Sequence, residues 1–167
     1  MEIDYISSYV SGLNIGFLTT ISALLDSDII FAVILVLVTI IGERRKEKLT
    51  KIIIVFALAF ILSAASKELF KISRPCIEQH MIQKVPCPRS YAFPSSHAAL
   101  SFALALAFLN KRSYPAYLLF AVFISFTRIY LSVHSFVDVA GGIVVAAISY
   151  YLIDLFVGEP NGKKRNS

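Results

Sequence analysis

Apolar residues gather in five blocks along the chain, separated by short polar or charged links. The blocks cover residues 29–41, 52–66, 98–109, 114–133 and 136–157. A helix needs about 20 residues to cross a bilayer, and the shorter blocks approach this length with flanking residues whose side chains reach the interface. Because lipid offers the backbone no hydrogen-bond partners, we expect each block to be a helix. The pattern predicts an all-α, polytopic transmembrane helical bundle of five spans.

The segment before these blocks, residues 3–25, is apolar but interrupted by serine, glycine and asparagine. We expect it to form an N-terminal interfacial or re-entrant helix, and a sixth span is the alternative. The Asp-Ser-Asp sequence at 26–28 is predicted to cap the helix that follows, since short polar side chains accept hydrogen bonds from the first amides of a helix.

Composition agrees with a membrane protein. Of the 167 residues, 57% are hydrophobic and 16% are charged, and the mean hydropathy is +0.72. Soluble domains carry about 25% charged residues. The chain shows no internal repeat and no soluble appendage, so we expect one membrane-embedded domain covering residues 1–167. The net charge of +5 is typical of basic cytoplasmic loops, and we expect no nucleic-acid partner.

The basic residues also predict the orientation. They concentrate at 42–51, 110–112 and 162–165, after the first, third and fifth blocks. With five spans these three links share one side, which the positive-inside rule makes cytoplasmic. Residues 71–93 and the turn around His134 would then lie on the outer side.

Three polar clusters fall on this outer side. In the first, Lys67, Lys71 and Arg74 are spaced as on one helix face, and Pro75 is expected to end that helix. Such residues can simply extend to the interface, but basic residues on the outer side favour an anionic ligand. In the second, 94–97, a Pro-Ser helix start offers free amides and hydroxyls to an anion beside His97, or is a plain cap.

The third cluster holds Arg128, His134 and Asp138. The i, i+4 spacing of the last two lets the carboxylate reach one imidazole nitrogen, so that the other faces outward as a nucleophile or base. A purely structural His–Asp hydrogen bond is the alternative. Ionisable residues in membrane segments are costly and usually functional, which favours chemistry here.

A single site would account for all three clusters. Lys67, Arg74 and Arg128 can neutralise the oxygens of a phosphoryl group, and two histidines can divide attack from protonation of the leaving group. The sequence shows no cluster of carboxylates, cysteines or histidines with the spacing of metal ligands. We therefore expect no metal and no other cofactor, with the cations replacing the metal usual in phosphoryl transfer.

These residues resemble the type-2 phosphatidic acid phosphatase family, the membrane branch of a superfamily that includes vanadium haloperoxidases. Its signatures are K-x6-R-P, P-S-G-H and S-R-x5-H-x3-D. Here they read Lys67-x6-Arg74-Pro75, Pro94-Ser95-Ser96-His97 and Thr127-Arg128-x5-His134-x3-Asp138. Ser96 stands in place of the usual glycine and Thr127 in place of serine. Ser96 keeps its backbone amide for an anion, and Thr127 keeps a hydroxyl.

The resemblance implies a metal-independent phosphatase. It implies that His134 is the nucleophile that forms a phosphohistidine, that Asp138 orients it, and that His97 is the general acid. The residues that it assigns to phosphate binding are Lys67, Arg74, Ser95, Ser96 and Arg128.

The expected substrate is a lipid phosphate or diphosphate monoester in the bilayer. An isoprenoid diphosphate is favoured, with phosphatidic acid and phosphatidylglycerol phosphate as close rivals. We expect an integral protein of the plasma membrane with its active site on the outer face. A lipid phosphotransferase, a non-catalytic protein that binds lipids or anions, and a channel or transporter are the alternatives.

Two further features concern packing. Cys76 and Cys87 lie in the predicted outer loop, where they can form a disulfide or stay as free thiols. The last block carries small residues that favour close packing of this span against a neighbour. They are Ala140, Gly141, Gly142, Ala146 and Ala147. The oligomeric state is not readable from the sequence.

Overall fold

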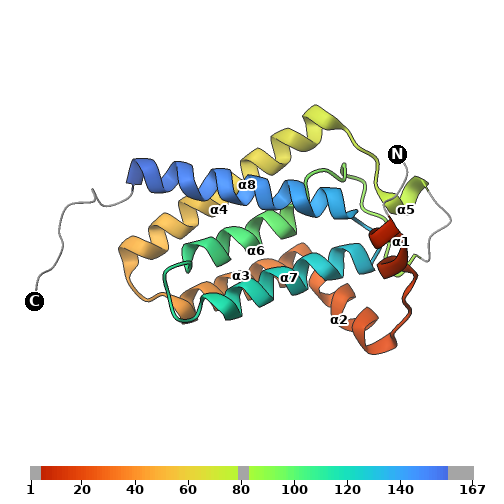
Figure 1. Cartoon of the computed structure of the whole chain (residues 1–167), viewed down its shortest axis with the longest axis horizontal. Helices are drawn as coiled ribbons and strands as arrows, with labels where there is room; N and C mark the ends of the chain where they lie inside the picture. The colour runs from red at the N-terminus through yellow and green to blue at the C-terminus, as the bar shows by residue number, and fades with distance from the viewer. Residues whose placement is uncertain (1–4, 79–82, 158–167) are drawn as a thin grey trace, which may run out of the picture.

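The structure is a computed structural model that describes residues 5–78 and 83–157. Within these ranges it contains eight helices and no strand (Figure 1). The helices are α1 (Tyr5–Gly12), α2 (Gly16–Asp26), α3 (Asp28–Gly42), α4 (Lys46–Phe70), α5 (Pro75–Glu78), α6 (Ser96–Ala107), α7 (Tyr114–Tyr130) and α8 (Phe136–Val157). The all-α prediction is confirmed, and each predicted block forms one helix.

Helices α4 and α8 are long and apolar enough to cross a membrane, whereas α3, α6 and α7 are shorter apolar helices. Helices α1 and α2 meet at an angle of 112° across residues 13–15 and together form either a broken span or a re-entrant loop. The segment 3–25 is therefore not one straight helix. The number of spans stays a prediction.

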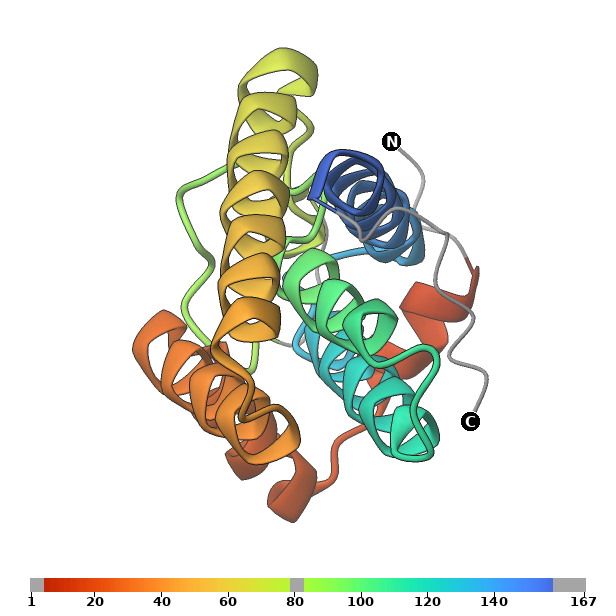
Figure 2. The same cartoon turned by 90° about the vertical axis from the view of Figure 1, so that its left-hand side faces the viewer.

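Helix α6 lies in the middle of the bundle. It packs against α4, α7 and α8, and Figure 2 shows these helices and α3 arranged around it. Its buried face is mostly alanine, with Ala98, Ala99 and Ala103 fully buried. Small side chains let neighbouring helix axes approach closely, which suits a short central helix in a membrane bundle.

The start of α8 approaches the start of α6 without a side chain between them. A Cβ added to Gly142 would lie 2.7 Å from the carbonyl oxygen of Ser95 and 2.9 Å from the Cβ of Ala98. The amide of Ser95 donates a 2.9 Å hydrogen bond to the carbonyl oxygen of Asp138. The missing side chain of Gly142 therefore lets the segment 95–98 lie against α8, where the hydrogen bond to Asp138 holds it, and the predicted close packing of the last span is present there.

The predicted cytoplasmic links lie at the end of the bundle opposite to Asp138 and Ser95, where ion pairs connect them. The ammonium of Lys111, after α6, lies 2.6 Å from the carboxylate of Glu43, after α3. Lys51 of α4 pairs with Asp154 of α8. The first two basic links therefore share one end of the bundle, as the orientation requires. The third link, 162–165, lies outside the described residues.

Two local predictions were wrong. Helix α4 ends at Phe70, and Lys71 adopts a left-handed conformation with φ 49°. Lys67, Lys71 and Arg74 therefore do not share a helix face. Pro75 begins α5 instead of ending α4, since proline suits the first turn of a helix and disfavours a helical residue before it.

The second wrong prediction concerns the start of α3. Ser27, before α3, makes no side-chain capping bond, so 26–28 is not the predicted cap.

Candidate active site

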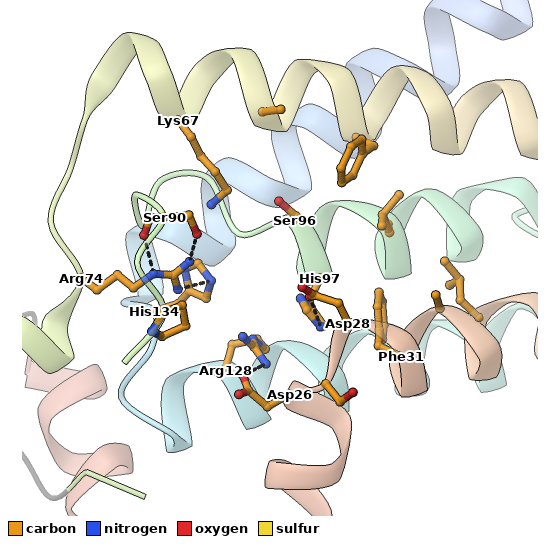
Figure 3. A pocket seen from close by; sticks show the side chains of 17 residues that line it. Asp26, Asp28, Phe31, Lys67, Arg74, Ser90, Ser96, His97, Arg128 and His134 are labelled. Carbon is orange, nitrogen blue, oxygen red and sulfur yellow. Dashed lines mark hydrogen bonds and ion pairs between the residues drawn. The ribbon is translucent and has the colours of Figure 1, made fainter. Parts of the chain in front are cut away.

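A cavity of about 810 Å³ opens where α4 ends and where α6 begins (Figure 3). It brings together six of the predicted site residues, namely Lys67, Arg74, Ser96, His97, Arg128 and His134. Ser95 and Asp138 do not line it and are buried behind it. Segments separated by about 70 positions in the sequence thus meet at one point.

His134 occupies the turn before α8, and Asp138 lies in the first turn of that helix. The Nδ1 atom of His134 is 3.5 Å from Oδ2 of Asp138, and the same oxygen accepts a 2.7 Å hydrogen bond from the amide of Ser135. The Nε2 atom lies 3.1 Å from Nη1 of Arg74. Arginine has only donors, so Nε2 accepts this bond and carries the lone pair that faces the cavity.

The environment of His134 favours its neutral form. The ring is almost completely buried, and burial lowers its pKa well below the usual 6.5. The nearby charges of Arg74 and Arg128 lower the pKa further. A neutral imidazole whose outward nitrogen keeps its lone pair is the form that can attack phosphorus.

A sharp turn places His134 beside Arg128. Helix α7 ends at Tyr130, and Ser132 adopts a left-handed conformation with φ 62°. The amide of His134 then donates to the carbonyl oxygen of Arg128 at 3.3 Å. The guanidinium of Arg128 is buried and pairs with the carboxylate of Asp26 at 2.6 Å. Its Nε atom makes no hydrogen bond to any described residue.

Lys67 and Arg74 shape the loop that crosses the cavity. Lys67 donates to the carbonyl oxygens of residues 91, 92 and 94 at 2.9, 3.2 and 2.8 Å. Arg74 donates to the backbone and hydroxyl oxygens of Ser90 at 2.7 and 2.9 Å and to the carbonyl oxygen of Val133 at 2.8 Å. Burial lowers the pKa of Arg74 to about 10, so it remains a cation at neutral pH.

The predicted helix start at 95–97 is confirmed, with Ser95 before the first residue of α6. The first amides of a helix have no partner within that helix, and here they belong to residues that border the cavity. Ser96 has no positive φ, so its place in the usual glycine position strains no backbone. The hydroxyl of Ser95 and Nε2 of His97 are buried without a hydrogen bond in the described part of the chain.

The structure adds residues that were not predicted for the site. Asp28, Phe31, Ser90 and Asp26 all line the cavity. The Phe31 ring lies 4.2 Å from the His97 ring, centroid to centroid, and Oδ1 of Asp28 lies 3.9 Å from Nε2 of His97. The sequence signal that could have found them is the pair of acidic residues beside an apolar segment, which was interpreted only as a helix cap.

Cys76 and Cys87 form a disulfide with a Cα–Cα distance of 5.9 Å. Cys76 packs on Tyr130, Leu131 and Val133, which precede His134. The bridge therefore holds the loop against the turn that carries the candidate nucleophile. Among the residues described, no group of three or more His, Cys, Asp or Glu side chains could hold a metal ion.

Comparison with known proteins gives a consistent result. The PAP2 superfamily model matches residues 48–160. The chain is 31% identical over 107 residues to a protein of Escherichia coli (strain K12) named "Putative undecaprenyl-diphosphatase YbjG", covering 62% of this chain and 54% of that one. It is 23% identical over 108 residues to mouse sphingosine-1-phosphate phosphatase 2, covering 59% of this chain and 30% of that one. The chain thus spans about half or less of these relatives.

Two solved structures share the fold. The crystal structure of Aquifex aeolicus LpxE superimposes with a TM-score of 0.72 at 24% identity, covering 89% of this chain and 92% of that one. That of a transmembrane PAP2-type phosphatidylglycerolphosphate phosphatase from Bacillus subtilis gives 0.66 at 19% identity, with coverage of 90% and 82%.

Proposed function

This chain belongs to the PAP2 superfamily, and from this premise we propose that it is an integral membrane enzyme that hydrolyses a lipid phosphate. The observation that carries the proposal is the pairing of His134 and His97 in one cavity. His134 has its Nδ1 atom 3.5 Å from Asp138 and turns its lone pair inward, and Nε2 of His97 is buried without a hydrogen bond to any described residue. Arginine and lysine charges surround both.

The phosphoryl group would bind between the cations and the start of α6. The Nε–H of Arg128 has no hydrogen-bond partner among the described residues and is available to a ligand, and the first amides of α6 favour an anion through their donors and the helix dipole. Lys67 contributes charge while its hydrogens hold the loop. Arg74 now donates to Nε2 of His134, and a phosphate oxygen would draw that donor away and leave the lone pair free to attack.

The reaction would proceed in two displacements. Nε2 of His134 forms a bond to phosphorus while the bond to the leaving oxygen breaks, and His97 gives that oxygen a proton. Asp138 stabilises the positive charge that then lies on the phosphohistidine ring. Water next attacks phosphorus, the P–N bond breaks, and His97 takes a proton from the water. Phosphate and the free enzyme result.

The remaining lining suits a lipid chain. Beyond His97 the cavity is bordered by apolar side chains of α3, α4 and α6, which are Phe31, Ala32, Leu35, Phe60, Ala64 and Leu100. Phe60 is 58% exposed on the outside of the bundle, where bilayer lipid would contact it. An alkyl tail could therefore extend from the phosphate into the membrane without crossing a polar barrier.

Related proteins support a lipid substrate and differ in its head group. Their names include an undecaprenyl-diphosphatase, a sphingosine-1-phosphate phosphatase and a phosphatidylglycerolphosphate phosphatase. The isoprenoid diphosphate favoured by the sequence stays one candidate among these. We further propose that the cavity faces away from the cytoplasm in the plasma membrane, since Glu43 and Lys111 join two basic links at the opposite end.

The test is phosphate release by the purified protein across substrates with leaving groups of increasing basicity. His134→Ala should abolish release from every substrate. His97→Ala should lower kcat/KM by about 10²–10⁴-fold on an alkyl lipid phosphate and far less on an aryl phosphate, which leaves without a proton. EDTA should not lower the activity, and vanadate should inhibit it.

Asp154→Asn is the control, because Asp154 pairs with Lys51 at the far end of the bundle. If the His134→Ala variant still released phosphate from the aryl phosphate, the assignment of His134 as the nucleophile would be contradicted. Equal losses by His97→Ala across the series would contradict its role as an acid. If EDTA abolished the activity and one specific metal ion restored it, the metal-independent reaction would be contradicted.

A further inference from the structure

Two carboxylates share the cavity with the cations and have no part in the proposed reaction. Asp26 is the last residue of α2, and Asp28 is the first residue of α3. Both line the cavity. Because a site for an anion would be expected to avoid negative charge, their presence calls for a physical explanation.

The two carboxylates differ in their partners. Asp26 pairs with Arg128 at 2.6 Å, and this contact offsets part of the charge that Arg128 can offer a ligand. Asp28 contacts no cationic lysine or arginine among the described residues. Its ion-pair partner is His97, at 3.9 Å, and its side chain is 96% exposed. Asp28 therefore makes no close ion pair with a lysine or arginine of the described residues, although its carboxylate interacts electrostatically with Arg74 and Arg128 from a greater distance.

The charges are also distributed unevenly around the cavity. Figure 3 shows Arg74 and His134 on one side and His97 with Asp28 and Phe31 on the other, with Lys67 above and Arg128 below. The cations of the lining are Lys67, Arg74 and Arg128. Besides Asp28, the lining on the α3 side of His97 is formed by Ser27 and by apolar side chains of α3, α4 and α6. A ligand that extends past His97 would meet a carboxylate and hydrocarbon.

This arrangement distinguishes two classes of lipid. In a monophosphate, the oxygen that receives the proton from His97 is bonded to carbon, which suits the apolar wall. In a diphosphate, the same oxygen is bonded to a second phosphorus with its own negative charge. That inner phosphate would lie next to Asp28, whose Oδ1 is 3.9 Å from the His97 nitrogen that gives the proton, and like charges repel.

We infer that Asp28 makes this site selective for lipid monophosphates over lipid diphosphates. The inference rests on the proposed function, because it uses the direction in which the substrate lies between His134 and His97. It narrows the substrate class, and it departs from the isoprenoid diphosphate that the sequence favours.

The test measures binding without turnover. In a His134→Ala background, the dissociation constants of farnesyl phosphate and farnesyl diphosphate are compared in detergent. The two lipids have the same tail, so the ratio of their dissociation constants reports only the effect of the second phosphate. We expect the monophosphate to bind about fivefold more tightly, as one exposed charge interaction allows.

Changing the charge at position 28 should then move this ratio in steps. Asp28→Asn should shift it about fivefold towards the diphosphate, as expected for one exposed charge interaction. Asp28→Lys should shift it about 25-fold, because it replaces repulsion with attraction. The exposed position of Asp28 means that both variants should fold. Asp154→Asn, in which the carboxylate that pairs with Lys51 is lost, should leave the ratio unchanged.

Two results would overturn the inference. One is tighter or equal binding of the diphosphate in the His134→Ala background. The other is a ratio that neither Asp28 variant moves, or that Asp154→Asn moves as much. Phosphate release by the wild-type protein is measured in parallel. If binding shows the preference but the wild-type protein releases phosphate from neither farnesyl lipid nor phosphatidic acid nor phosphatidylglycerol phosphate, the proposed function is wrong and the binding preference stands. If neither farnesyl lipid binds while another lipid phosphate is hydrolysed, the proposed function stands and the selectivity inference is wrong.

Discussion

The contact between α6 and α8 at Gly142 allows a sharp test of how precisely the bundle positions the site. In Gly142→Ala, the new Cβ would meet the Ser95 carbonyl oxygen at 2.7 Å, the Ala98 Cβ at 2.9 Å and the Ala99 nitrogen at 3.1 Å. Two of these atoms belong to the backbone of α6 or its cap, and the third is fixed to it. None can turn aside, so the helices must separate.

The size of the effect follows from these distances. Bringing the 2.7 Å contact to an ordinary 3.4 Å requires a displacement of roughly 0.7 Å, and overpacking of this kind costs about 1–3 kcal/mol of stability. Asp138 and His134 would move with α8, whereas Ser96 and His97 would stay with α6. Since a misplacement of about 1 Å can cost about 10²-fold in rate, we expect kcat to fall about tenfold.

The assay compares kcat and thermal unfolding in detergent for three alanine variants. Gly16→Ala is the control, because nothing lies within 4 Å of its added Cβ. Gly141→Ala meets the Phe93 ring at 2.3 Å, a shorter contact, but a ring can turn away, so its effect should be milder than that of Gly142→Ala. If Gly142→Ala had the same kcat and unfolding temperature as Gly16→Ala, the reasoning from close backbone approach would be refuted. A larger loss of kcat and stability in Gly141→Ala than in Gly142→Ala would refute it as well.

Two predictions concern pH. Burial and nearby cations keep the pKa of His134 well below 6.5. The kcat/KM for an aryl phosphate should therefore stay constant as the pH falls through 6.5 and decrease only at lower pH. A decrease in kcat/KM with its midpoint at pH 6.5 or above would contradict this. The hydrogen bond from Lys111 lowers the pKa of Glu43 from 4.5 to about 2, so its stabilisation is present above pH 4.5 and is lost towards pH 2. Glu43→Gln should therefore lower the unfolding temperature at pH 7 but not at pH 2, and an equal loss at both would refute the assignment.

Local chemistry made much of the site predictable. His134 and Asp138 lie four positions apart around a helix start, so their proximity needs only that local geometry. The start of α6 follows from Pro94 and Ser95, whose preferences are also local. Lys71 shows where this reasoning fails. A regular helix would align it with Arg74, but its left-handed conformation ends α4 and directs Arg74 into the cavity from a loop.

The sequence by itself determined the helices, because an apolar run in lipid must satisfy its own backbone and has no alternative to a helix. It also determined which residue types could carry phosphoryl chemistry. Only the tertiary structure decided that Asp26 would pair with Arg128 and that Asp28 would lie beside His97. These contacts join residues about 70 to 100 positions apart. They depend on how α2 and α3 pack against α6 and α7, and side-chain packing between helices leaves no periodic signal in the chain.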